Sequence, residues 1–379
     1  MKKLNKFTNL LLFLLALNML IVPCVALEDQ LTVYQELVGL ERADLDIVYE
    51  NTSFPEYDIY LAAINLTNEY PMYSYTLLLE CRKHVIEEQV KNSVDGMDGD
   101  EARNLLLSTV KKDKNTISER MDSVEPKTIA SSEWKSLAKA NFDRGEEMFE
   151  KLKESNFSDM NTTIAMAAST HLYLHKTDNL LTMAELRNNG TISFDPAELL
   201  YAEQVYASEQ IEIESNKEEP NSNLLDMSQS YYDAENYYFA LMLITEANVS
   251  VDAPNSEFDD IAVAEQRLNL TKKVLSSIRE EGDIDAPLVQ LKVELAVLRL
   301  EDAKKERVVV PSLLISSVIQ EVTIANEQLD VLQDLKKNIG NIPHEEIILQ
   351  EEASTDTMFT PVGLFPLIGL VVAYLVRRN

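Results

Sequence analysis

Residues 287–307 read PLVQLKVELAVLRLEDAKKER, and this stretch decides the fold class. At helical spacing its residues divide into one apolar side (Leu288, Leu291, Leu295, Leu298), a second apolar side (Val289, Val293, Ala296, Leu300, Ala303) and a narrow polar stripe (Gln290, Glu294, Glu301). A surface helix needs only one apolar face, so a helix with two is covered by neighbours on both flanks. The stretch therefore predicts several helices packed side by side.

The rest of the chain also favours an all-α fold. Only nine of the 379 residues are glycine, and apolar residues recur at helical spacing nearly throughout. We predict a long helical bundle or an α-solenoid-like array of antiparallel helices, flanked by a signal peptide and a transmembrane helix. The predicted helices are 28–50, 72–94, 128–155, 160–188, 196–215, 287–307 and 311–339. The predicted parts are a signal peptide (1–26), an N-terminal helical region (27–125), a helical array or bundle (126–340), a linker (341–357) and a transmembrane anchor or sorting tail (358–379).

The segment 315–339 carries a coiled-coil-like seam. Its apolar residues follow a 3,4 alternation that Lys336 interrupts: Ile315, Val318, Val322, Ala325, Leu329, Leu332 and Ile339. Such a seam is either internal to the fold or a surface for self-association.

The N-terminus has the pattern of an export signal. Three lysines precede an apolar run over 10–22, and Cys24-Val25-Ala26 suits cleavage after Ala26. A lipoprotein with an acylated Cys24 is the alternative. Cleavage after Ala26 leaves only Cys81, so the mature chain forms no intramolecular disulfide and depends on its core.

The C-terminus has the pattern of a membrane anchor. From Met358 to Val376 nineteen residues carry no charge, enough to cross a hydrocarbon core of roughly 30 Å. Arg377 and Arg378 follow, and such positive charge stays on the cytoplasmic side. We expect a cell-membrane protein with an extracellular ectodomain and a cytoplasmic C-terminus; a buried C-terminal helix is the alternative.

The tail also resembles a known sorting signal. Gly369-Leu370, Ala373-Tyr374-Leu375 and Arg377-Arg378 are similar to the three-part tails of exported surface proteins of methanogenic archaea. In that family a Pro-Gly-Phe signature opens the tail, which is cut as the protein passes to a lipid. This chain reads PVGL at 361–364 instead, so a retained span and a cleavable signal both stay open.

The exported part is strongly acidic. All 64 acidic residues lie between Glu28 and Asp356; setting aside Lys2, Lys3, Lys6, Arg377 and Arg378 leaves 29 of the 34 basic residues, hence a net charge near −35. That field repels nucleic acid and anionic lipid headgroups, so neither is an expected partner. The negative charge is consistent with attraction of cations, with colloidal stability and with ordinary solvated helix faces.

Seven Asn-x-Ser/Thr sequons are candidate glycosylation sites in an exported chain. They are Asn51, Asn65, Asn156, Asn161, Asn189, Asn248 and Asn269.

One segment resembles a tetratricopeptide-type helical hairpin. The pattern consists of Ser228, Tyr231, Tyr237, Ala240, Ile244, Ala247 and Pro254. Glu235 stands where that family favours glycine, and an ordinary core stripe explains the same spacing. More loosely, residues 231–307 are similar to helical regions that follow the catalytic domain of membrane-anchored archaeal Lon-type proteases, although no protease domain is apparent.

The chain offers few candidates for chemistry. His171 and His175 lie one turn apart with Asp178 on the next turn, a spacing that could hold a metal, but a zincin-type Glu and a cysteine partner are missing. The acidic loop 95–100 is interpreted as a connector with an N-cap at Asp100 rather than a calcium loop. We therefore predict no catalytic residue, metal or cofactor.

These observations predict a membrane-anchored, glycosylated extracellular helical protein. Its expected role is a protein-interaction or cell-envelope scaffold with an unidentified protein partner. The alternatives are a metal-dependent hydrolase using His171 and His175, or a ligand-sensing ectodomain working with a membrane partner.

Overall fold

Twelve helices and no strand make up the part of the chain that the computed structural model describes, residues 32–50, 56–154, 159–189, 192–249, 261–280, 283–305 and 311–339. The prediction of an all-α fold is confirmed. The helices are α2 (Thr32–Glu50), α3 (Tyr57–Leu66), α4 (Pro71–Val94), α5 (Gly99–Ser123), α6 (Ile129–Glu154), α7 (Met160–Arg187), α8 (Pro196–Ser215), α9 (Ser222–Asp233), α10 (Tyr237–Asn248), α11 (Ile261–Glu280), α12 (Pro287–Ala303) and α13 (Pro311–Asn338).

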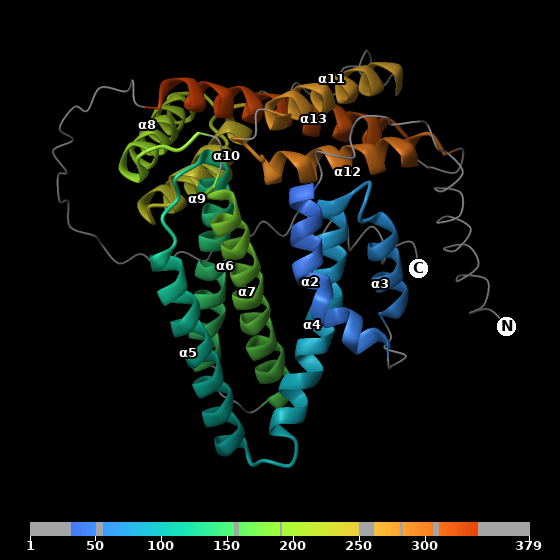
Figure 1. Ribbon diagram of the computed structural model, residues 1–379, viewed down its shortest axis with the longest axis vertical. Coiled ribbons are helices and arrows are strands. Elements are labelled where there is room, and N and C mark those ends of the chain that lie inside the picture. Colours follow the sequence, from blue (N-terminus) through green and yellow to red (C-terminus); the bar gives the residue numbers. More distant parts are fainter. Residues whose placement is uncertain are drawn as a thin grey trace. The chain divides into compact units, whose positions relative to one another are not determined.

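Helices α6 and α7 form the most extensive pair, and they run side by side in Figure 1. Gly145 makes their close approach possible, because a Cβ there would lie 3.3 Å from the Cβ of Tyr173. Helices α4 and α5 both pack on α7, and α5 also packs on α6. These contacts cross the predicted boundary at residue 125.

Helix α12 is covered by α13, α11 and α4, as its two apolar sides predict. In its polar stripe Gln290 and Glu294 are also buried and Glu301 is partly buried, which the sequence did not indicate. Glu294 accepts the backbone N–H groups of Met72 (3.3 Å) and Tyr73 (2.7 Å), and Glu301 accepts from the Tyr70 hydroxyl at 3.3 Å. The stripe therefore binds the start of α4, where backbone donors have no partner within the helix.

The apolar seam of α13 is buried within the same chain. Residues from Ile315 to Ile339 join one core with side chains of α8, α10, α11 and α12. Lys336, the interruption in the seam, reaches Asp283 with Nζ 2.9 Å from Oδ2. Self-association through this helix stays a prediction.

Helix ends follow the sequence in most places. Asp195 caps α8 through Oδ1, which accepts the N–H of Ala197 at 2.8 Å, and Pro196 is the first helical residue. The prediction of an N-cap at Asp100 is wrong, because α5 begins at Gly99, two residues earlier than that cap implies. Asp98 is the cap, and its Oδ1 accepts the N–H of Glu101 at 2.8 Å.

The four residues 283–286 tie the helices together. Asp285 accepts Trp134 Nε1 at 2.6 Å and Arg187 Nη2 at 2.8 Å, while its backbone oxygen accepts from the Tyr34 hydroxyl and from Arg279. With Lys336 on Asp283, side chains of α2, α6, α7, α11 and α13 all meet this segment. We call residues 283–286 the central segment.

Glu133 of α6 fixes the backbone of the central segment. Its Oε2 accepts the N–H groups of Asp285 (2.8 Å) and Ala286 (3.0 Å), and its Oε1 accepts from the Tyr238 hydroxyl at 3.2 Å. Ala286 has a φ of 50°, a left-handed conformation that costs a residue with a Cβ about 1–2 kcal/mol. The two hydrogen bonds that Glu133 accepts hold the chain in that conformation immediately before α12.

Replacing Asp285 by Asn should destabilise the protein by about 3–5 kcal/mol, because the Arg187 guanidinium then loses its buried carboxylate partner. Chemical denaturation measures the loss. The control is Asp334→Asn, whose exposed pair with Lys337 contributes under about 1 kcal/mol. Equal effects of the two variants would contradict the central role of Asp285.

Helices α9 and α10 form a hairpin whose turn passes through Glu235. Its φ is 59°, the left-handed conformation that glycine adopts without a steric cost. The ring of Tyr231 meets Phe239 edge-on at 4.6 Å, and Tyr232 meets Tyr237 at 5.0 Å. The hairpin thus forms without the glycine; Pro254 of the pattern lies outside the described residues.

Glu235→Gly should raise the free energy of unfolding by about 1 kcal/mol, since it removes the left-handed strain at an exposed position. Thermal unfolding measures the gain. Glu235→Gln removes the charge but keeps the strain, so its stability should stay close to that of the parent. If only the Gln variant is more stable than the parent, the charge of Glu235 and not its backbone strain lowers the stability.

The predicted signal peptide (1–26), linker (341–357) and anchor (358–379) lie outside the described residues. Within the described ranges, no helix combines the length and apolar character needed to cross a membrane.

Candidate functional site

A groove of about 530 Å³ lies between α4, α5 and α7. Figure 1 shows α4 and α5 joined by a turn at one end and diverging from it, with α7 beside both. One stripe from each helix lines the groove: Arg82, Ile86, Gln89, Val90 and Ser93 from α4; Leu105, Leu106, Thr109, Asp113, Thr116 and Ile117 from α5; His171, Leu174, His175 and Asp178 from α7. Apart from adjacent pairs, the residues of each set are three or four positions apart, so each helix turns one continuous face to the groove.

His171 faces Asp113 across the groove, with 3.1 Å between Nδ1 and Oδ2. Burial lowers the pKa of His171 below its ordinary 6.5, and Asp113 opposes that shift. In the neutral ring Nδ1 donates to the carboxylate, which leaves Nε2 as an acceptor.

His175 belongs to a second cluster, centred on the fully buried Glu41 of α2. Glu41 accepts from His175 Nε2 at 2.8 Å and from Asn179 Nδ2 at 2.9 Å. Its other carboxylate oxygen accepts from Arg82 Nε at 2.7 Å, and its backbone oxygen accepts from Arg82 Nη2 at 3.0 Å. One buried carboxylate therefore ties α2 to α4 and α7, with its charge compensated by Arg82.

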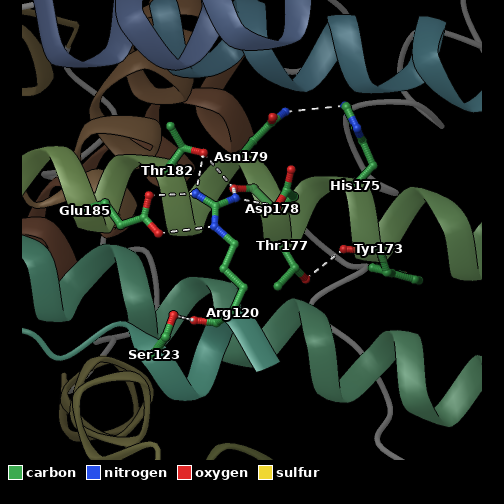
Figure 2. A network of polar contacts seen from close by, with 9 residues as sticks. All are labelled: Arg120, Ser123, Tyr173, His175, Thr177, Asp178, Asn179, Thr182 and Glu185. Carbon is green, nitrogen blue, oxygen red and sulfur yellow. Dashed lines mark hydrogen bonds and ion pairs between the residues drawn. The ribbon is translucent and has the colours of Figure 1, made fainter. Parts of the chain in front are cut away.

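Asp178 belongs to a third cluster, which Figure 2 shows around Arg120. The Arg120 guanidinium pairs with Asp178 and donates to both Glu185 oxygens, at 2.7 and 3.2 Å, and to Thr182 Oγ1 at 3.0 Å. Such a two-pronged arginine contact has a fixed geometry. It joins the last turns of α5 to α7 beside the groove.

His171, His175 and Asp178 thus have the spacing of metal ligands, but each side chain contacts a different set of partners. Among the described residues no group of three or more His, Cys, Asp or Glu side chains converges as metal ligands would. Sequence spacing places the three residues on one face of α7 but does not reveal Glu41, Arg82 or Asp113. These come from other helices, and no local pattern marks them.

Cys81 also lies buried, and it forms no disulfide. Burial raises the pKa of its thiol to about 12. The side chain therefore stays a thiol at neutral pH and is a poor nucleophile.

Three of the buried carboxyl groups outside the groove have a raised pKa, and burial is the main cause of the shift in each. The pKa is raised to about 8 for Glu133 and to about 7 for Glu203 and Glu294. Glu203 differs from the other two because its Oε1 finds no hydrogen-bond partner in the described part of the chain. Ionisation of Glu203 would therefore leave one carboxylate oxygen buried without a hydrogen bond.

Glu203→Gln should remove a pH dependence of stability. The folded protein retains a proton on Glu203 that the unfolded chain releases above its ordinary pKa of 4.5, so the free energy of unfolding falls as the pH rises to about 7. Compared with the parent, the Gln variant should be more stable by up to about 3 kcal/mol at pH 8 and little changed at pH 4. Urea unfolding at both pH values measures this, and a pH-independent difference would contradict it.

The described sequons differ in their surroundings. Asn65 lies in the last turn of α3, Asn161 in the first turn of α7, Asn189 just after α7 and Asn269 within α11, all of them exposed. Asn248 instead donates from Nδ2 to the backbone oxygen (3.2 Å) and Oε1 (2.9 Å) of Gln210. Asn51 and Asn156 lie outside the described residues.

Comparison with protein-family models, with curated proteins and with solved structures finds no match to this chain. Its class is that of an all-α protein with a groove between three helices.

Proposed function

We propose that the protein is a membrane-anchored, glycosylated extracellular helical scaffold that presents an acidic surface to protein partners of the cell envelope. The observation that carries the proposal is the central segment. It gathers five helices around one buried site, and a body held in this way offers surfaces of fixed geometry to a partner.

Charge and sequon placement give further support. A net charge near −35 outside the two termini, from 64 acidic and 29 basic residues, favours solubility beside an acidic surface coat and disfavours nucleic acid. Four of the five described sequon asparagines are exposed, where an oligosaccharide meets no packed neighbour.

A metal-dependent hydrolase is the weaker candidate, because His171 and His175 are each bound to a different carboxylate. A ligand-sensing ectodomain gains support from the groove between α4, α5 and α7.

Glycopeptide mapping of the native protein, combined with membrane fractionation, tests the proposal. We expect the protein in the membrane fraction, with glycan on at least some of Asn65, Asn161, Asn189 and Asn269 and none on Asn248, whose Nδ2 is engaged by Gln210. Asn161→Gln should remove one glycan mass, whereas the matched Asn248→Gln should remove none. A cytosolic, unmodified protein would contradict the proposal.

Crosslinking on native membranes tests the scaffold role separately. Recurrent crosslinks from exposed lysines to a defined envelope protein are the expected result. If the protein is membrane-bound and glycosylated but shows no recurrent crosslinked neighbour, the proposed location stands and the scaffold role is rejected.

A further inference from the structure

The polar atoms left free in the groove are mainly hydrogen-bond acceptors. Burial lowers the pKa of His171, and in the neutral ring Nδ1 faces Asp113 at 3.1 Å, so Nε2 keeps its lone pair. This Nε2 has no partner among the described residues, and the same holds for the second oxygen of Asp113. The hydroxyls of Ser93, Thr109 and Thr116 already donate to backbone oxygens of their own helices.

The cations beside the groove are already paired. Arg82 binds Glu41 and lies near Asp44, and Arg120 binds Asp178 and Glu185. Asp113 has only a neutral imidazole as its partner, so its negative charge is not compensated within the described residues.

The walls beside these acceptors are apolar. Ile86 and Val90 of α4, Leu105, Leu106 and Ile117 of α5, and Leu174 of α7 line the groove. A volume of about 530 Å³ lies in the range of small-molecule sites. A fitting ligand therefore combines an apolar body with a hydrogen-bond donor that carries positive charge.

From this complementarity we propose that the groove binds a small organic ammonium ion with an alkyl or aryl body. The ammonium group donates to Asp113, and the apolar body packs against α4 and α5. A metal ion is the poorer occupant, because the described residues bring no third ligand to the two histidines.

Calorimetric titration of the purified full-length protein with 2-phenylethylammonium tests the proposal. Two control probes have an apolar body of similar size: 2-phenylethanol is neutral and 3-phenylpropanoate is anionic. We expect the ammonium probe to bind at least about tenfold more tightly than either, since a charge-assisted hydrogen bond contributes about 1.5–3 kcal/mol. Equal binding of the alcohol, or no binding of the ammonium probe at about 1 mM, would overturn the proposal.

A matched pair of variants on α5 locates the site. Asp113→Asn should weaken binding of the ammonium probe about tenfold, because it removes the uncompensated charge. Asp122→Asn makes the same chemical change at an exposed position of the same helix outside the groove, and binding should not change. Both positions are accessible to solvent, so circular dichroism should show parental helix content in both. Equal affinities of the two variants would place the ammonium ion elsewhere and overturn the proposal.

Discussion

The carboxyl group of Glu133 accepts two successive backbone N–H groups, those of Asp285 and Ala286. The arrangement of the helices depends on this contact because it sets the chain direction immediately before α12 and holds Ala286 in a left-handed conformation. With the backbone fixed, the Asp285 side chain lies within reach of Trp134 and Arg187, and its carbonyl within reach of Tyr34 and Arg279. Three of these partners, Tyr34, Trp134 and Arg187, are 98 to 251 residues distant from Asp285 in the chain.

Buried carboxyl groups are used in the same way elsewhere. Glu41 binds α2 to α4 and α7, and Glu294 binds α12 to the first N–H groups of α4. Removing a carboxylate from water is costly, and each contact offsets that cost with several donors. Apolar faces alone would let these helices slide along one another, whereas a carboxylate with fixed donors favours one register. The polar stripe of residues 287–307, which reads like a solvent-facing edge, serves as such a contact.

The groove follows from the same packing. Helices α4 and α5 both pack on α7. The polar side chains that face the space between these three helices line the groove. His175 and Arg82 connect the groove to the Glu41 cluster, and Arg120 holds the neighbouring turns of α5 and α7 together. The groove is therefore bordered by two sets of contacts that also stabilise the fold.

The sequence by itself determined the fold class, the limits of seven of the twelve described helices to within four residues, and the cap at Asp195, because periodicity and capping are local and act within a few residues. It also placed His171, His175 and Asp178 on one helix face. Only the tertiary structure decided that these three side chains have different partners, that Glu294 and Gln290 are buried, and that Glu235 and Ala286 take left-handed conformations without being glycine. The reason is physical: a pairing such as Glu41 with Arg82 or Tyr34 with Asp285 depends on distance in space, and one helix carries no signal of which side chain another helix will bring to it.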